Sequence, residues 1–235
     1  MKVVIIQSNY LPWKGYFDLI NDADIFCFYD EVQYTKNDWR NRNKIYSKNG
    51  LQWITIPINK EAVKGKISEA RLPENWQKQH YNILKITYGR APFYSNLELI
   101  MKDIYLENKF DYLSEFNQYS IQKIAAYLNI TTRFVNSKSY KLNGDRVERL
   151  ISLLKAVGAS EYISGPSAKN YLAGKEFNFT RNSINITFKD YSGYPMYNQL
   201  RAPFENYVSI ADLIANLSQE EIINKIWGWR MQTIE

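Results

Sequence analysis

The chain has 235 residues and a formal net charge of +6, from 30 basic and 24 acidic side chains, with 45% hydrophobic residues and one cysteine. A chain of this length can bury a substantial core, and a lone cysteine excludes an internal disulfide and a cysteine-based metal cluster. The positive excess is modest for a dedicated nucleic-acid binder, so nucleic acid is not an expected partner. Small anions such as nucleotides and phosphates match it better.

The first apolar runs predict a parallel sheet. Val3–Ile6 and Ile25–Tyr29 are short and continuously apolar, as strands are when both faces of a sheet are covered. Between them, Tyr16–Asn21 is predicted to be a helix. The next stretch, at about residues 42–58, alternates and contains Asn49-Gly50, which predicts a β-hairpin with this pair at its tip.

The rest of the chain adds helices and further strands. Residues from Pro73 to about 129 have a helical pattern in three pieces. Strands are predicted at Phe134-Val135, Tyr162-Ile163 and Ile184–Phe188, and a helix at Arg146–Val157. This order predicts an α/β fold, with a Rossmann-like, mostly parallel sheet and the hairpin and helical block inserted after the second strand. We expect one domain over residues 1–235.

Several common functional signals are missing from the sequence. It has no apolar run of about 18 residues, and its N-terminal apolar run is too short for a signal peptide, so we expect no membrane insertion and a cytoplasmic location. It also has no Gly-rich phosphate loop, no supported Ser-His-Asp order and no cluster of metal ligands. We therefore expect no metal and no cofactor.

Candidate ligand residues follow the strands, because ligands of open parallel sheets bind outside the carboxyl ends of the strands. After the first strand, Gln7 and Tyr10 are candidates to hydrogen-bond a sugar or a base. Alternatively, Gln7 bonds to loop backbone and Tyr10 packs on Trp13. After the second strand, Asp30 and Gln33 are predicted ligand groups, although an aspartate there equally well caps the loop by accepting from backbone N–H groups.

Two arginines give the strongest chemical signal. Arg40 and Arg42 are two positions apart, so in an extended segment both side chains leave from the same face. Two guanidinium groups placed in this way would bind a diphosphate. The alternative is a solvated basic turn or a salt-bridged hairpin edge. Farther along, Ser164 and Gly165 precede a short predicted helix, where they either hold an anion or cap the helix.

His80 is the only histidine of the chain. It shares an apolar helical face with Trp76 and Tyr88, which is typical of a core residue. Its unperturbed pKa nevertheless suits proton transfer near neutral pH, so His80 is also the candidate general base. Cys27 lies inside a buried strand and is expected to be inert.

Three long segments resemble one known family. They are IIQSNYLPWKGYFDLINDADIFCFYDEVQY, QHYNILKITYGRAPFY and ERLISLLKAVGASEYISGPSAKNYL. They are similar to the WbqC-like family, bacterial proteins often encoded in O-antigen and other surface-polysaccharide gene clusters, and the similarity covers most of the chain. The resemblance implies an enzyme of nucleotide-sugar metabolism in lipopolysaccharide biosynthesis, with transfer of an acyl or aminoacyl group to an amino sugar as its reaction.

On this interpretation the partners are a nucleotide-activated sugar and an acyl or aminoacyl carrier protein. Arg40 and Arg42 would bind the diphosphate, and His80 would take the proton from the attacking amine. The sugar or acceptor would be positioned by Gln7, Tyr10 and Asp30, and Asp30 would be a catalytic residue together with His80. The alternative is a non-catalytic binding or scaffold protein of a polysaccharide assembly complex. A looser similarity of Pro12–Tyr16 to the P-x-H-x-G-H motif of nucleotidyltransferases lacks both histidines and bears on the fold alone.

Overall fold

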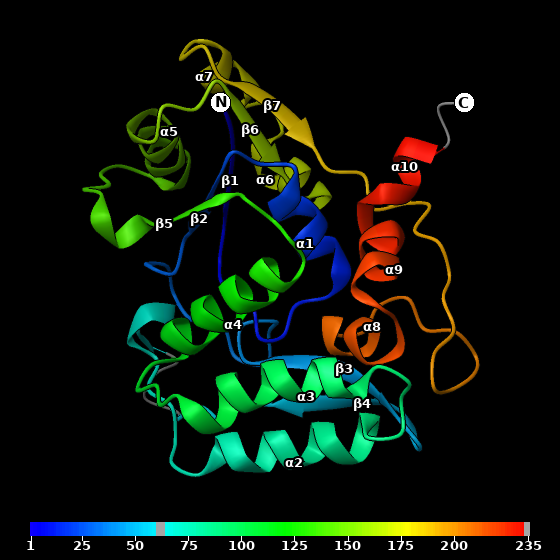
Figure 1. Ribbon diagram of the computed structural model, residues 1–235. Coiled ribbons are helices and arrows are strands. Elements are labelled where there is room, and N and C mark those ends of the chain that lie inside the picture. The colour runs from blue at the N-terminus through cyan, green and yellow to red at the C-terminus, as the bar shows by residue number, and fades with distance from the viewer. Residues whose placement is uncertain (60–63, 233–235) are drawn as a thin grey trace.

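A five-stranded parallel sheet forms the centre of the protein in the computed structural model, which describes residues 1–59 and 64–232, with the backbone alone for the last two of these. The strands lie in the order β5-β2-β1-β6-β7 (Figure 1). Their bounds are β1 Lys2–Ile6, β2 Ile25–Phe28, β5 Arg133–Asn136, β6 Glu161–Ser164 and β7 Asn185–Phe188. The predicted α/β class and the predicted strands are confirmed, with boundaries that differ by one or two residues.

β1 lies in the middle of the sheet and has a parallel partner on each side. Val4 is paired in register with Phe26 of β2 and with Ile163 of β6. The chain passes from β1 to β2 on one side and comes back much later to β6 on the other side. The strand order therefore reverses between β1 and β6, and a reversal of this kind opens a crevice outside the carboxyl ends of the two strands.

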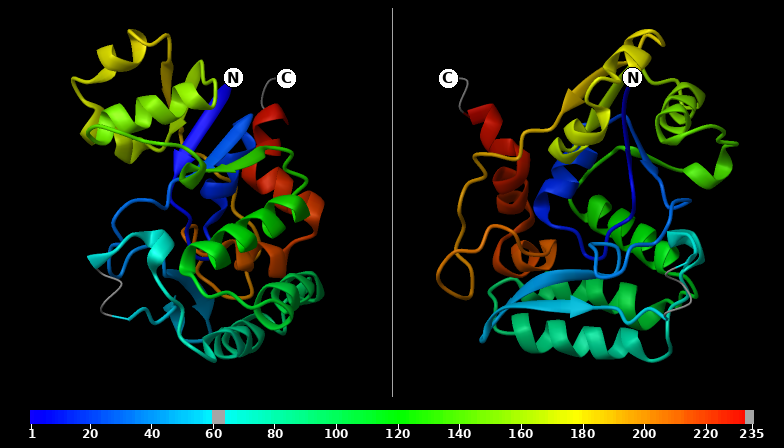
Figure 2. Two further views of the ribbon diagram at one scale, coloured as in Figure 1. Left: turned by 90° about the vertical axis from the view of Figure 1, so that its left-hand side faces the viewer. Right: turned by 180° about the vertical axis from the view of Figure 1, so that it is seen from behind.

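Helices cover both faces of the sheet (Figure 2). On one face, Val4 and Phe26 belong to a buried cluster that includes residues of α1 (Lys14–Asn21) and α4 (Leu113–Tyr127). On the other face, Cys27 is buried against apolar side chains of α5 (Arg146–Ala156). Burial raises the pKa of the Cys27 thiol to about 12, so the thiol is protonated at neutral pH and inert, as expected. The helices α6 (Lys169–Leu172) and α7 (Glu176–Thr180) follow β6.

The inserted hairpin and helical block form a second layer, seen below the sheet in Figure 1. The hairpin consists of β3 (Arg42–Ser47) and β4 (Gly50–Thr55). The tip of the hairpin is one residue away from the predicted place. Gly50 pairs with Ser47, and the turn between them consists of Lys48 and Asn49. A φ of +87° at Gly50 explains why glycine stands at the first position after the turn.

The helical block contains the three predicted pieces. They are α2 (Trp76–Tyr88), α3 (Tyr94–Lys102), which continues into the π-helix η3 (Asp103–Glu107), and α4. One buried cluster extends from the hairpin to α2 and on to the sheet, through residues such as Ile45, Leu84 and Phe28. The hairpin and the helices therefore share a core with one face of the sheet.

The C-terminal segment forms helices that the sequence did not predict. They are α8 (Ile210–Asn216), α9 (Gln219–Ile223), the π-helix η6 (Asn224–Gly228) and α10 (Trp229–Gln232). In Figure 1 they run beside α1, with α8 packed on α3 and η6 on α1. Every residue of α8 is buried. A helix buried on all sides lacks the 3.6-residue alternation of apolar and polar residues by which helices are recognised in a sequence.

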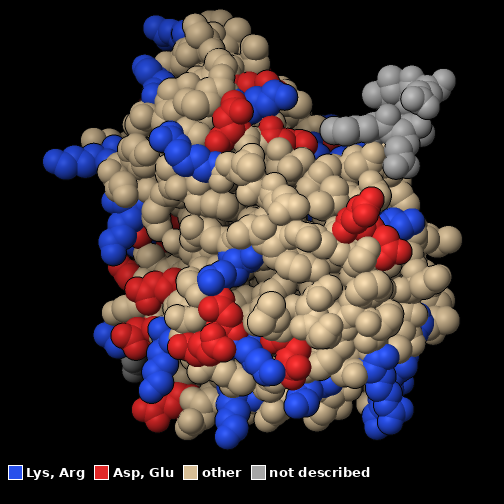
Figure 3. Space-filling model, in the orientation of Figure 1, with Lys and Arg blue, Asp and Glu red and all other residues tan. Residues whose placement is uncertain are grey.

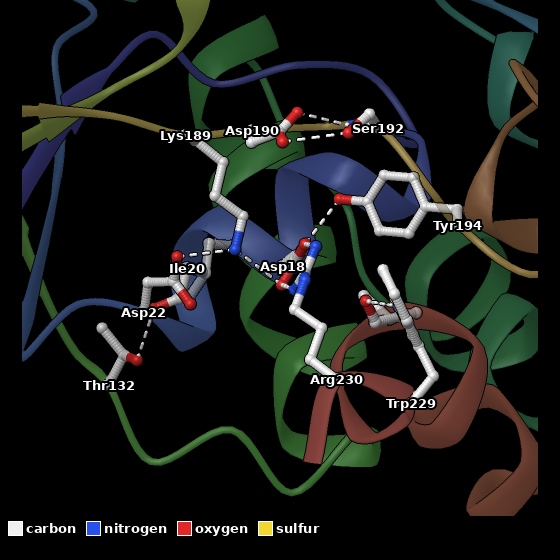
Figure 4. A network of polar contacts seen from close by, with 11 residues as sticks. Asp18, Ile20, Asp22, Thr132, Lys189, Asp190, Ser192, Tyr194, Trp229 and Arg230 are labelled. Carbon is white, nitrogen blue, oxygen red and sulfur yellow. Dashed lines mark hydrogen bonds and ion pairs between the residues drawn. The ribbon is translucent and has the colours of Figure 1, made fainter. Parts of the chain in front are cut away.

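One buried carboxylate joins three distant parts of the chain (Figure 4). Asp18 of α1 is fully buried and accepts two hydrogen bonds from the Arg230 guanidinium of α10, at 2.9 and 2.8 Å. The Lys189 ammonium, directly after β7, lies 2.8 Å from Asp18 and 2.6 Å from Asp22. The Tyr194 hydroxyl also donates to Asp18. This network fastens α10 and the segment after β7 to α1.

Lys14, the first residue of α1, is an unusual buried lysine. Its side chain is fully buried, and its ammonium has no hydrogen-bond partner among the described residues. The nitrogen lies 4.8 Å from the ring centroid of Tyr194, 5.6 Å from that of Tyr197 and 5.8 Å from that of Phe204. Cation–π contacts with three rings offset part of the cost of burying the charge. Burial lowers the pKa of Lys14 to about 8.

We expect Lys14→Met to stabilise the protein at pH 7. The pKa of Lys14 is about 8 in the folded protein and 10.5 in the unfolded chain, so between these pH values the unfolded state binds more protons at Lys14. The free energy of unfolding therefore rises with pH in this window. Below it, the buried charge of Lys14 destabilises the folded state most. Methionine removes the poorly paired buried charge, which should raise the free energy of unfolding by about 1–3 kcal/mol at pH 7. Denaturant titrations of both proteins at pH 7 and pH 10 should show the difference shrinking at pH 10. A less stable variant at pH 7 would contradict this account.

Candidate functional site

A cleft of about 950 Å³ opens outside the carboxyl ends of β1 and β6, where the strand order reverses. Its floor includes Ile6 of β1 and Ile163 of β6. Of the residues predicted from the sequence to contact a ligand, the structure brings five to its lining, namely Gln7, Gln33, Arg40, Ser164 and Gly165. They come from three loops that are far apart in the sequence but leave the same edge of the sheet.

Arg40 is held in a fixed position at the cleft. Its Nη1 donates to Asn9 Oδ1 at 2.6 Å, and its Nη2 donates to Gln7 Oε1 at 3.1 Å. The Asp38 carboxylate lies 3.7 Å from the same guanidinium, and the Arg40 side chain is 16% exposed. Arg40 is thus fastened to the loop after β1 although it lies more than thirty residues further along the chain. A guanidinium that is already oriented loses little entropy when it binds an anion.

Two further arginines, which no motif in the sequence had indicated, also line the cleft. Arg146 and Arg149 lie in the first turns of α5, after the N-cap Asp145. The guanidinium carbon of Arg146 is 3.9 Å from the ring centroid of Tyr171, another lining residue. A signal for them existed, because the helix after a parallel strand begins at the edge where the strands end. Basic residues at the start of the predicted helix Arg146–Val157 therefore belong near the other site loops.

Asp30 is not among the residues that line the cleft. It is buried, with Oδ1 accepting from the Ser8 backbone N–H at 2.8 Å and Oδ2 accepting from Gln118 Nε2 at 2.7 Å. Gln118 in turn accepts from Asn136 Nδ2 at 3.0 Å. These bonds tie together the carboxyl ends of β1, β2 and β5. Burial raises the pKa of Asp30, and the hydrogen bonds from Gln118 and Ser8 oppose that rise. The contacts match the loop-capping alternative.

Arg42 does not join Arg40 at the cleft. It is the first residue of β3, and its guanidinium carbon lies 4.1 Å from the ring centroid of Trp53 on β4, outside the lining. The prediction of a two-arginine face assumed that both residues lie in one extended segment. Arg40 instead lies in the turn before β3, so the alternation of side chains between faces does not reach it.

Tyr10 and His80 lie in the core and not at the cleft. Both are buried, and the Tyr10 hydroxyl is 2.7 Å from His80 Nδ1 and 2.6 Å from the Tyr105 hydroxyl. Trp76 packs edge-on against His80, and Phe116 lies tilted against Tyr10. Burial lowers the pKa of His80 to about 4, with a backbone interaction at Thr55 opposing the shift. A neutral imidazole that accepts from Tyr10 fits the core alternative, and the geometry gives no support to His80 as the general base.

The buried His80 makes a prediction about acid stability. Its folded pKa of about 4 lies below the ordinary 6.5, so only the unfolded state takes up this proton as the pH falls from 6.5 to 4. This group alone should lower the free energy of unfolding by on the order of 3 kcal/mol across that window. Denaturant titrations of the wild type and of His80→Asn at pH 7 and pH 4.5 should show a smaller acid loss in the variant. An equal loss in both proteins would contradict the prediction.

Three further observations concern surface charge, metal ligands and membrane-spanning helices. Charged side chains of both signs are interspersed on the face shown in Figure 3, so that face gives no support to a nucleic-acid interface. Over residues 1–59 and 64–232, no group of three or more His, Cys, Asp or Glu side chains is placed to hold a metal ion. The same part of the chain contains no helix with the length and apolar character needed to cross a membrane.

The parallel sheet, with a cleft at its strand-order reversal, places the protein in the class of Rossmann-like α/β folds. The chain belongs to the WbqC-like protein family, whose family model matches residues 7–224. It is 44% identical over 224 residues to an uncharacterized protein of Mycobacterium tuberculosis, a match that covers 93% of this chain and 95% of that protein. No solved structure matches the chain. The resemblance seen in the sequence is thereby confirmed, and all residues of the cleft named above except Ile6 lie within the matched range.

Proposed function

We propose that the protein binds a nucleotide-activated sugar in the cleft and transfers an acyl or aminoacyl group from a carrier to an amino group of that sugar. An amide bond forms, the bond between the acyl group and its carrier breaks, and the carrier leaves. The observation that carries this proposal is the placement of Arg40, Arg146 and Arg149 around a cleft at the reversal of strand order. Guanidinium groups are suited to the bidentate binding of phosphates. The cleft volume of about 950 Å³ also lies within the usual range for ligand pockets, about 300–1,000 Å³.

Each part of the ligand has matching side chains. The pre-oriented Arg40 would bind the diphosphate, and Arg146 stacked on Tyr171 offers a flat surface for the base. Gln7 and Gln33 offer amide groups to sugar hydroxyls. These assignments replace Tyr10 and Arg42, which the fold directs elsewhere.

The proton of the attacking amine needs an acceptor at the cleft. Because His80 lies in the core, the acceptor would be one of the carboxylates of the lining. Asp38 already accepts from the Thr35 hydroxyl and the Trp39 backbone and lies near Arg40. Glu31 also lines the cleft, with the Lys66 ammonium 2.9 Å away, and we assign the proton to Glu31.

A ligand screen tests the proposal. Uridine and thymidine diphosphate sugars that carry an amino group should raise the melting temperature, since a ligand at 100 times its Kd stabilises by about 2.7 kcal/mol. The free amino sugars should have a much smaller effect, because they lack the diphosphate. Incubation with acyl and aminoacyl donors should then yield a product of increased mass. Binding without product from any donor class would support the scaffold alternative, and no binding at all would refute the proposal.

A further inference from the structure

A second cavity opens beside the cleft, which we call the side pocket. Its volume is about 290 Å³, and its lining includes Tyr29, Glu31, Lys66, Ser137, Lys138 and Arg149. Ser137 and Lys138 directly follow β5, so the side pocket belongs to the same edge of the sheet as the cleft. Tyr29, Glu31 and Arg149 line both cavities. The two cavities therefore meet at these three side chains.

The side pocket carries an excess of positive charge. Lys66, Lys138 and Arg149 face a single carboxylate, Glu31, which already has the Lys66 ammonium 2.9 Å away. Burial raises the pKa of Glu31, but hydrogen bonds from Ser68 and Lys66 outweigh it, so the pKa is lowered and Glu31 is ionised at neutral pH. Within residues 1–59 and 64–230, no carboxylate lies within ion-pair distance of Lys138 or Arg149. Lys138 acts on Glu31 only from beyond that distance, and Arg149 donates its Nε to the Gly144 carbonyl at 2.9 Å, so both keep a positive charge that can attract an anion.

A buried hydroxyl also indicates, independently of charge, that the side pocket binds an anion. Ser137 is 1% exposed and lines the side pocket, yet its Oγ has no hydrogen-bond partner among the described residues. Buried polar groups are nearly always paired, so an unpaired one calls for an explanation. A bound anion that accepts from this hydroxyl supplies one. The neighbouring Lys138 would then give the same anion a charged donor.

We propose that the side pocket is an anion subsite, which binds the carboxylate or phosphate group of a second substrate while the nucleotide sugar occupies the cleft. The volume holds a small acid or the acidic end of a larger donor. Glu31, at the junction, then lies next to both substrates. The claim that the bound anion belongs to a second substrate rests on the proposed function. The claim that the side pocket binds an anion does not.

Titration of the isotope-labelled protein with inorganic phosphate, and separately with acetate, tests the subsite by ¹H–¹⁵N NMR. We expect saturable shifts of the Ser137 and Lys138 amides. Saturation by phosphate alone would identify a phosphate site, and saturation by acetate as well would identify a site that also takes carboxylates. Lys138→Gln should bind the anion about tenfold or more weakly, as expected for the loss of a charged hydrogen bond. The exposed Lys141, which does not line the side pocket, provides the matched control Lys141→Gln with unchanged binding.

Ser137→Ala separates a binding role from a structural one. Because the hydroxyl has no partner within the protein, the variant should bind the anion more weakly without a lower melting temperature. The inference is overturned if neither anion shifts these amides, or if Lys138→Gln binds phosphate as the wild type does. Binding of nucleotide sugars in the cleft is measured separately and would survive that outcome. Conversely, an anion subsite in a protein that binds no nucleotide sugar would refute the proposed function alone.

Discussion

Replacing Asp18 with alanine should lower the free energy of unfolding by about 3–5 kcal/mol, the usual cost of removing one partner from a buried ion pair. The substitution leaves Lys189, whose side chain is 7% exposed, with Asp22 as its remaining carboxylate. It also removes both acceptors of the Arg230 guanidinium within the network of Figure 4. Denaturant titration at pH 7 measures the change directly.

Asp22→Ala is the matched control for this prediction. Asp22 contacts the same Lys189 ammonium, but its side chain is 33% exposed, and Lys189 would keep Asp18. Because partly exposed ion pairs contribute little, we expect a loss of about 1 kcal/mol or less. Equal losses in the two variants would show that Asp18 does not hold the C-terminal helices to α1.

Arg40→Ala should weaken binding of the nucleotide sugar that gives the largest thermal shift by about 1.5–3 kcal/mol, the value of a charged hydrogen bond. Arg42→Ala should leave the affinity nearly unchanged, because Arg42 stacks on Trp53 outside the cleft. The two residues have the same chemistry and are two positions apart, so the comparison isolates the effect of location. Isothermal titration calorimetry of the three proteins measures it.

Arg40→Lys extends the comparison to geometry. Lysine keeps the charge but cannot donate simultaneously to Asn9, Gln7 and a diphosphate in the planar arrangement of a guanidinium. We therefore expect Arg40→Lys to bind more weakly than the wild type and more tightly than Arg40→Ala. Equal losses in Arg40→Ala and Arg42→Ala would mean that a diffuse positive field attracts the ligand, and the assignment of Arg40 to the diphosphate would be wrong.

The central part of the fold could be predicted from local patterns. Val3–Ile6 and Ile25–Tyr29 are continuously apolar because both faces of the sheet are covered, and that requirement acts on each strand separately. The start of α5 is likewise local, because Asp145 and Glu148 form a capping box within four residues. The C-terminal helix α8 could not be recognised in this way, since every one of its residues is buried.

Part of the candidate site followed from the same local information. In a parallel sheet every strand ends at the same edge, so Gln7, Gln33 and Ser164 had to lie near one another once their strands were recognised. The sequence also contained the arginines at the start of α5. Their place in the same cleft as Arg40 depends on how α5 crosses back over the sheet, which no single segment determines.

The direction of each loop side chain was decided by the tertiary structure alone. Tyr10 turns into the core because His80 and Tyr105, 70 and 95 positions away, satisfy its hydroxyl there. Arg42 turns to Trp53 because of the pairing between β3 and β4, while Arg40 is drawn to the loop after β1. The sequence by itself determined the family, the strands and the edge of the sheet where the cleft opens. Which side chains reach that edge is set by packing and hydrogen bonds between residues far apart in the chain, and local patterns contain no information about those partners.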